Sequence, residues 1–174
     1  MPGFMVVGDG GGERSPENTA EVRRKHRWSF ITMGGIGNPS ILLVLREAQR
    51  PNFKLEEPDM HHNQEQVYFA GKQSWDPIKL TWYDIEQEPN DVSKAMWDWL
   101  QKTVQFPKIN VQIPSNYKQQ ATLQMENGAG TETETWKLFG AWPKEMNWQD
   151  LNYTSTDLAT IECTLRYDRA ERTT

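Results

Sequence analysis

The chain has 174 residues, with 19 lysines and arginines against 24 aspartates and glutamates, which gives a formal net charge of −5. This length suits one domain with a substantial core, because a chain of roughly 150 residues buries about 70% of the surface that it exposes when unfolded. The acidic balance argues against a conventional DNA-binding protein, because an acidic surface repels phosphates.

The single cysteine excludes an intrachain disulfide framework. The sequence also lacks a signal-peptide pattern and an apolar run of about 18 residues. We therefore expect a protein that is made and kept in a reducing cytoplasm, with no membrane contact. Eight tryptophans are an unusual number for this length, and tryptophan is favoured in cores, protein interfaces and sugar-binding platforms.

Residues 1–25 mix glycine, proline and charge, which predicts a flexible N-terminal arm ahead of one domain at residues 26–174. The arm ends in the basic cluster Arg23-Arg-Lys-His-Arg27. Such a cluster could contact phosphate or an acidic partner, although solvated charges are the commoner outcome. Strand patterning follows directly, because Trp28 and Phe30 alternate with polar residues.

The run Ile41–Leu45 is apolar throughout and is bounded by prolines. It fits either a strand buried on both faces or a segment packed against another subunit. The rest of the span from Gly37 to Gln64 is predicted to be irregular, with prolines as punctuation. Strand patterns resume at residues 66–70 and 78–83.

One helix is predicted, at about residues 90–104. Asp91 can cap its N-terminus, and apolar residues recur at three- and four-residue steps along it. Trp97 falls outside this stripe. That side chain is therefore either half-buried under a loop or in contact with another molecule.

The C-terminal half is predicted to be β throughout. Three segments alternate apolar and polar residues, at 109–113, 121–126 and 159–167, as expected when one face of a strand meets a core and the other meets water. Asn127-Gly-Ala-Gly130 after the second segment is a hairpin signal. These patterns together predict a mainly β fold with one short helix.

The glycine-rich segments do not predict a phosphate site. Neither Gly8–Gly12 nor Gly34–Gly37 ends in Gly-Lys-Ser/Thr or opens a periodic helix. His61 and His62 are adjacent, so they cannot share one face of a strand as paired metal ligands usually do. We expect no metal and no bound cofactor.

Catalytic groups are not evident either. Cys163 lies in mid-strand on the apolar face, which is typical of an inert core thiol. The carboxylate pairs Glu56-Glu57 and Glu132 with Glu134 lie among polar residues, and nothing near them in sequence separates the pKa values of an acid and a base. We expect solvated acids and no enzymatic activity.

The polar strand faces suggest another use. If several subunits joined their sheets edge to edge, these faces would form a hydrophilic, mildly negative concave wall that gives a duplex little to grip. The residues expected on this wall are Thr122, Gln124, Glu126, Thr160, Glu162 and Thr164.

The C-terminal part also carries a recognisable order of motifs. It contains the hairpin sequence ATLQMENGAGTETETWKLFG, the step Gly140-Ala-Trp-Pro143, and a final strand that closes on Leu165-Arg-Tyr-Asp168. Earlier, the segment from Trp75 to Tyr83 precedes the tryptophan-rich helix. In order and spacing, these motifs resemble the tail tube proteins of contractile-tailed bacteriophages of the T-even type, over roughly residues 26–170.

The resemblance implies a β-sandwich or barrel-like protomer with a small flanking helix. Such protomers assemble into hexameric rings that stack into the inner tube of a phage tail, and the tubes of type VI secretion systems and siphophages are similar in fold. The implied partners are further copies of the chain, the tail sheath, the baseplate and terminator proteins, and DNA that passes through the lumen during ejection without specific binding. The implied location is the virion. The wall residues would then face the lumen, where Glu126 and Glu162 would keep DNA from sticking.

A tube wall needs strand edges and apolar surface that are satisfied only in the assembly. The residues expected at subunit interfaces are Ile41, Leu43, Leu45, Trp97, Trp142 and Trp148. In the stretch LFGAWPKEMNW, Gly140 and Pro143 are predicted to make a sheet corner that Trp142 and Trp148 pack against the core or a neighbour.

An alternative of another class is a carbohydrate-binding β-sandwich. The excess of tryptophan motivates it, because aromatic faces stack on sugars. Glycan binding that is lost on Trp142→Ala or Trp148→Ala would favour this alternative.

Overall fold

A computed structural model describes residues 23–37, 39–62, 65–86, 91–105, 107 and 110–173. Seven of the described strands form one antiparallel sheet in the order β1-β10-β11-β12-β7-β2, with β13 also paired to β11. The bounds of these strands are Trp28–Met33 (β1), Leu45–Ala48 (β2), Ile78–Tyr83 (β7), Gln119–Glu126 (β10), Glu132–Trp148 (β11), Thr160–Arg166 (β12) and Arg169–Arg172 (β13). The mainly β fold is therefore confirmed.

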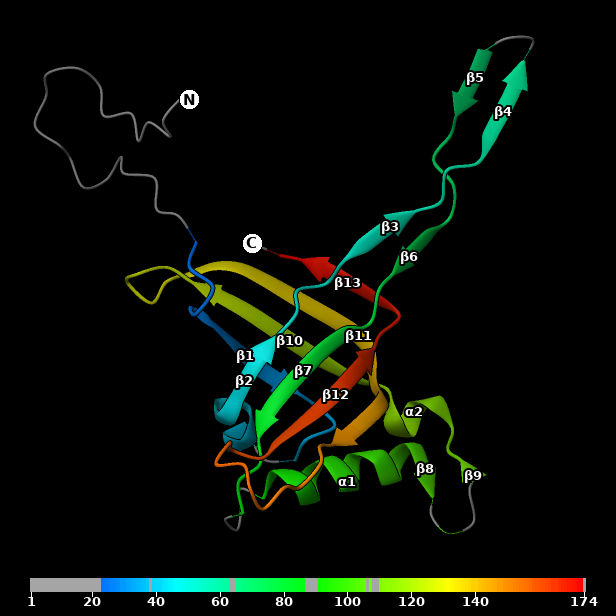
Figure 1. Ribbon diagram of the computed structural model, residues 1–174. Coiled ribbons are helices and arrows are strands. Elements are labelled where there is room, and N and C mark those ends of the chain that lie inside the picture. The colour runs from blue at the N-terminus through cyan, green and yellow to red at the C-terminus, as the bar shows by residue number, and fades with distance from the viewer. Residues whose placement is uncertain are drawn as a thin grey trace, which may run out of the picture.

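Strand β11 divides this sheet into two halves (Figure 1). Its residues up to Ala141 pair with β10 and β13, and those from Trp142 onward pair with β12. We call β1, β10, β13 and the first part of β11 the first half-sheet, and β2, β7, β12 and the last part of β11 the second half-sheet. The predicted corner is present, but as a bend within one strand: Gly140 has a φ of 65°, and the register shifts between Pro143 and Glu145.

The core lies between the two half-sheets. Leu123 and Leu138 come from the first half-sheet, and Leu80 and Leu165 from the second, and all four belong to one buried cluster. Buried and more exposed residues alternate along β7 and β10, as the sequence pattern predicts for strands with one face on a core.

Helix α1 (Val92–Thr103) closes the lower end of the core (Figure 1). Its N-terminus is capped by Asp91, whose Oδ1 accepts a hydrogen bond from the backbone N–H of Lys94 at 2.8 Å. Its buried residues, Val92, Met96, Trp99 and Thr103, follow the helical repeat. The predicted helix is confirmed, apart from its predicted first residue, Asn90, which lies outside the described part.

The apolar run at Ile41–Leu45 is not the strand that its composition suggested. Residues Pro39–Val44 form a 3-10 helix, and β2 begins at Leu45. Ile41 and Leu42 are both buried in the core, and a strand would have sent these neighbours to opposite faces. Pro39 suits the helix start, because it has no N–H to leave unpaired.

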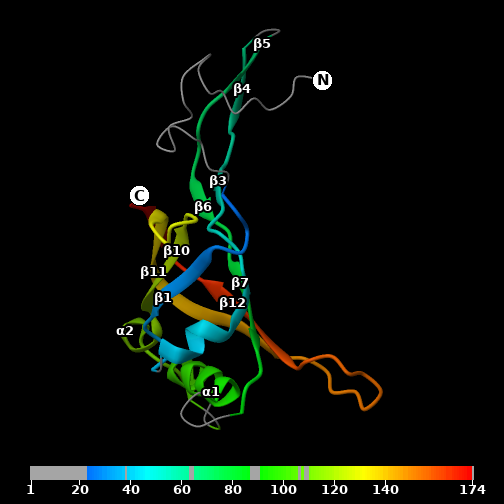
Figure 2. The same ribbon diagram turned by 90° about the vertical axis from the view of Figure 1, so that its left-hand side faces the viewer.

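The span predicted to be irregular contains a long two-stranded ribbon. Strand β3 (Phe53–Leu55) pairs with β6 (Gln73–Trp75), and β4 (Asp59–His62) pairs with β5 (Glu65–Tyr68). The ribbon, residues 53–75, extends away from the body in two perpendicular views (Figures 1 and 2). The prediction of irregular structure was therefore wrong for β3 and β4, whereas β5 largely matches the strand predicted at 66–70.

The segment after α1 also differs from prediction. The strands β8 (Val104–Gln105) and β9 (Asn110–Val111) form a short pair, and Pro114–Tyr117 forms the one-turn helix α2. Val111 and Ile113 are exposed, so the predicted core-facing strand at 109–113 was wrong; Ile109 lies outside the described residues.

Candidate functional site

The thiol of Cys163 is not suited to act as a nucleophile. This thiol is buried in the core, and burial raises its pKa to about 12, so the reactive thiolate is almost absent near neutral pH. No group of three or more His, Cys, Asp and Glu among the residues with described positions could hold a metal ion. The side chains of His61 and His62 lie outside the described part, as does Gly8–Gly12.

Gly35 has a packing role instead of a phosphate-binding one. A Cβ at this position would lie 2.0 Å from the indole atoms Cε2 and Nε1 of Trp99, so only glycine lets the backbone approach the ring. None of the helices within the described ranges is long and apolar enough to span a membrane.

Three of the predicted wall residues lie together on the first half-sheet. Thr122, Gln124 and Glu126 alternate with buried residues of β10 and so face away from the core. Strand β1 extends this surface, because Ser29 Oγ donates to Glu126 Oε1 at 3.4 Å, and Thr32 Oγ1 donates to Thr122 Oγ1 at 3.0 Å. We call these five residues the first polar face.

The other three predicted wall residues lie on β12 in the second half-sheet. Glu162 and Thr164 are half-buried and alternate with buried residues of the same core. Thr160 is buried and donates to Gln149 Oε1 at 3.1 Å. Because both half-sheets turn their apolar sides to one core, their polar faces lie on different sides of the protomer, and one wall can contain only one of them.

The predicted interface residues fall into two groups. Ile41 is 1% exposed and belongs to the protomer core, so it has no surface to offer a neighbour. The adjacent Leu43 is 85% exposed, and Leu45 and Trp142 are half-buried.

Trp97 and Trp148 form an exposed aromatic pair. Their ring centroids are 6.1 Å apart, and Trp148 Nε1 donates to Ser93 Oγ at 3.0 Å. They remain 41% and 37% exposed. Trp142 packs elsewhere, with its ring centroid 5.9 Å from that of Tyr117, so the tryptophans on which the carbohydrate alternative rests have different partners.

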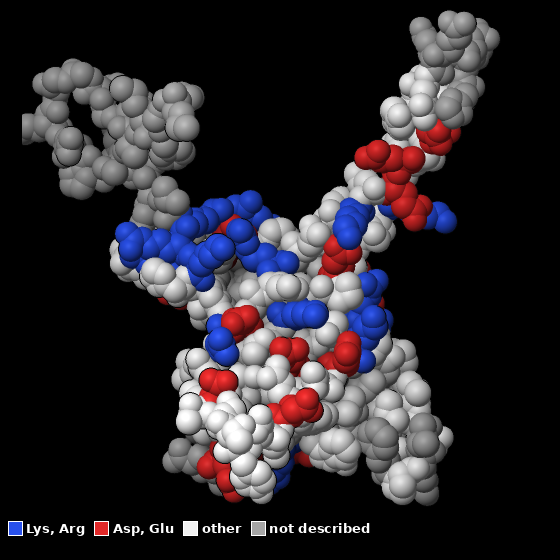
Figure 3. All heavy atoms as spheres, in the orientation of Figure 1, with Lys and Arg blue, Asp and Glu red and all other residues white. Residues whose placement is uncertain are grey.

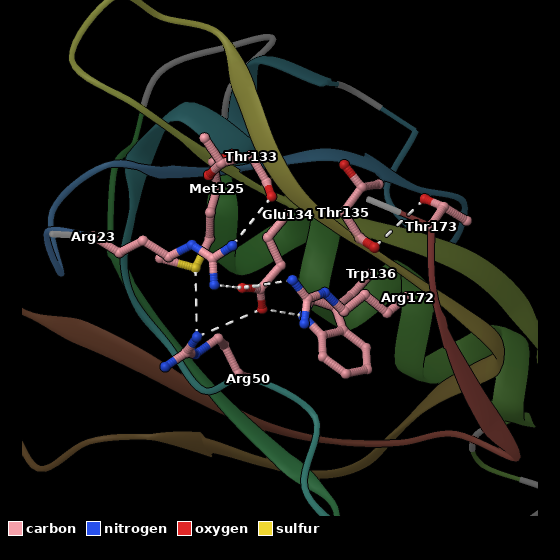
Figure 4. Close-up of polar contacts among 9 residues, drawn as sticks. All are labelled: Arg23, Arg50, Met125, Thr133, Glu134, Thr135, Trp136, Arg172 and Thr173. Carbon is pink, nitrogen blue, oxygen red and sulfur yellow. Dashed lines mark hydrogen bonds and ion pairs between the residues drawn. The ribbon is translucent and has the colours of Figure 1, made fainter. Parts of the chain in front are cut away.

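A buried carboxylate that the sequence analysis took for a solvated acid lies at the other end of β11. The side chain of Glu134 is 3% exposed, and Figure 4 shows three arginines converging on it. Arg23 Nη1 lies 2.7 Å from Glu134 Oε2, and Arg50 Nη1 lies 3.5 Å from Oε1. Arg172 Nη2 lies 4.0 Å from Oε2. Trp136 Nε1 donates to Oε1 at 2.5 Å.

These contacts decide the charge state of Glu134. Burial alone would raise its pKa, but the hydrogen bond from Trp136 and the charges of Arg23, Arg50 and Arg172 outweigh that effect and lower the pKa below its ordinary value. The carboxylate is therefore ionised near neutral pH. Through the three arginines, Glu134 links the residues just before β1, the foot of the ribbon and the last strand. We call Glu134, Trp136, Arg23, Arg50 and Arg172 the Glu134 cluster.

A basic groove of about 440 Å³ adjoins this cluster. Figure 3 shows lysines and arginines gathered at the end of the body from which the ribbon leaves, and both acidic and basic groups along the ribbon. The residues that line the groove are Arg23, Arg24, Lys25, Trp28, Arg46, Glu47, Ala48, Arg50, Leu123 and Met125. The basic groove thus combines a cationic rim with apolar side chains beneath it.

Comparisons with known proteins agree on one family. The sequence profile described as T4-like virus tail tube protein gp19 matches residues 47–171. The tail tube protein of Serratia phage KSP90 is 22% identical over 156 residues, which are 86% of this chain and 88% of that protein.

Solved structures show the same fold. One is the sheath-tube complex of an extracellular contractile injection system in its extended state, with a TM-score of 0.69, 18% identity and coverage of 92% of this chain and 99% of that one. Another is the tube-terminating cap of the anti-feeding prophage, with a TM-score of 0.70, 17% identity and coverage of 90% and 93%. This chain belongs to the T4-like virus tail tube protein family, whose members are structural subunits of a tail tube and not enzymes.

Proposed function

We propose that this protein forms hexameric rings that stack into the inner tube of a contractile phage tail, through which DNA passes during ejection. The tube would lie in the virion inside a sheath, after synthesis in the host cytoplasm. The observation that carries the proposal is a polar sheet face that ends in an open edge: within the described part, β1 pairs only with β10. An unpaired edge strand is an aggregation hazard unless a partner covers it, and a ring of copies would supply that partner.

We assign the lumen wall to the first polar face. Its residues are hydroxyls, one amide and one carboxylate, which offer phosphates no cation. Lys137 points to the same side of the half-sheet, but it lies opposite Glu171 in the register of β11 and β13. The wall would therefore be neutral to negative, as free passage of DNA requires.

The second half-sheet is less suited to a lumen. Lys79 is exposed on its outer side, and the guanidinium of Arg46 lies 5.7 Å from the ring centroid of Tyr83. Cations and an aromatic ring are groups that hold nucleic acid. Glu162 and Thr164 of this half-sheet are accordingly placed outside the lumen in this proposal.

Charge reversal at Glu126 tests the assignment. Tubes assembled from a Glu126→Lys variant are expected to bind a short DNA duplex more than about tenfold more tightly at low salt, because every ring adds cations that face the duplex and release its counterions. Binding is measured by fluorescence anisotropy with assembled tubes. Glu162→Lys makes the same charge change on the other half-sheet and is the control. Tighter DNA binding by tubes of Glu162→Lys than by tubes of Glu126→Lys would contradict the assignment.

A further inference from the structure

The basic groove and the ribbon have complementary chemistry, and we propose that the ribbon of one copy docks in the basic groove of a second copy. This inference rests on the proposed function in one respect, that copies of the chain assemble. The two surfaces that meet are the ribbon and the basic groove, and opposite charges and apolar side chains hold them together.

The groove holds a positive charge that the described residues only partly neutralise. Arg23 and Arg50 are engaged by Glu134, and Arg46 Nε lies 3.3 Å from Glu47 Oε1. Arg24 and Lys25 are exposed at the same rim. The Glu134 cluster thus fixes the position of two of the rim arginines, and Arg24 and Lys25 add charge that no carboxylate among the groove-lining residues balances.

The apolar part of the groove favours a mixed ligand over a simple anion. Trp28 is half-buried, and Leu123 and Met125 are buried beneath the rim. A ligand that fits this groove therefore presents carboxylates beside apolar side chains, as a segment of protein does.

The ribbon presents that combination at its midpoint. Glu56 and Glu57 are exposed there, between the strand pairs β3–β6 and β4–β5, and they outnumber the neighbouring exposed Lys72. Leu55 and Met60 flank them and are exposed as well. The midpoint is held in shape by backbone hydrogen bonds from Glu56 N to Lys72 O at 2.9 Å and from Gly71 N to Glu56 O at 2.7 Å.

The body contacts the foot of the ribbon, where Trp75 packs against the core, but it gives the ribbon strands no pairing partner among the described residues. The four strands of the ribbon pair only with one another among the described residues, and the ribbon leaves the body in both views (Figures 1 and 2). A lone two-stranded ribbon is marginally stable in water. Contact with a second copy would cover its apolar side chains and order it.

The geometry of the contact suits a repeating assembly. The ribbon follows directly after Arg50, so each copy carries its groove at the foot of its own ribbon. A contact that joins two different surfaces of identical copies is heterologous, and it repeats from copy to copy instead of closing on one pair.

A charge swap in the full-length chain tests the docking. We expect Arg24→Glu with Lys25→Glu, and separately Glu56→Lys with Glu57→Lys, to raise the protein concentration needed for tube assembly by more than about tenfold, because like charges would then meet at the contact. The four substitutions together are expected to restore assembly to within roughly threefold of wild type. Asp150→Lys with Asp157→Lys, in the exposed β11–β12 connection, is the control and should leave assembly unchanged.

Cross-linking of the wild-type protein gives a readout that does not depend on any variant folding. A carbodiimide joins amines to carboxylates, and tubes assembled from mixed isotope-labelled and unlabelled chains should give Lys25–Glu56 or Lys25–Glu57 cross-links between chains. Cross-links that form only within one chain, or double variants that assemble as wild type does, would overturn the docking and leave the tube function standing. Failure of the wild-type chain to assemble would overturn both.

Discussion

Replacing Trp99 with alanine is expected to cost about 3 to 5 kcal/mol of unfolding free energy, the range found when a buried tryptophan or phenylalanine is truncated. Trp99 is 0% exposed and packs so closely on Gly35 that a Cβ there would overlap the ring. The loss is one of packing, because the buried Nε1–H of Trp99 has no hydrogen-bond partner among the described residues. A loss of this size approaches the whole stability of a typical domain.

Trp97 provides a matched control on the same helix. It is the same residue type, two positions away, but 41% exposed. Trp97→Ala should cost less than about 1.5 kcal/mol, because the ring of Trp97 is 41% exposed and its truncation removes less buried surface than truncation of Trp99 does. Urea denaturation of the unassembled protein measures the unfolding free energy of both variants. Equal losses for the two variants would contradict the packing described for α1.

Glu134→Gln is the second large expected effect, a loss of about 1 to 3 kcal/mol at neutral pH. Glutamine can still accept the hydrogen bond from Trp136, but it has no charge for the three arginines. Breaking a fully buried ion pair costs more than this, whereas here the arginines are about half exposed and part of their interaction is screened by water.

The loss at Glu134 should depend on pH with a definite sign. The pKa of Glu134 is lowered in the folded protein from an ordinary value of 4.5. Its ionised form therefore contributes stability that is fully present above pH 4.5 and is lost as the pH falls through the folded-state pKa. The gap in unfolding free energy between wild type and Glu134→Gln should shrink on acidification below pH 4.5. Glu145→Gln, at an exposed position of the same strand, should show no such gap; a pH-independent loss at Glu134 would contradict the ionic account.

Local patterns predicted part of the local structure, although they missed the 3-10 helix at Pro39–Val44 and the strands of the ribbon. The apolar repeat and the Asp91 cap gave α1 within two residues of its observed ends, and the Asn127–Gly130 turn gave the β10–β11 hairpin. The bend at Gly140 was predictable because glycine tolerates a positive φ and proline removes a ladder donor. These features depend on residues that are neighbours in the chain.

Features that depend on distant residues were missed. Arg50 lies 84 positions from Glu134, so no local pattern distinguished this carboxylate from the exposed Glu132. The alternation along β10 and β12 predicted which side chains avoid the core. It could not tell that the two strands belong to different half-sheets, since that depends on the change of partner along β11.

Electron cryomicroscopy of the purified protein at high concentration would show whether copies of this chain assemble into a tube lined by the first polar face. We expect hollow tubes of stacked hexameric rings, with β10 turned to the lumen and Glu126 on its wall. A protein that stays monomeric, or a tube in which Glu126 faces outward, would rule out this assembly.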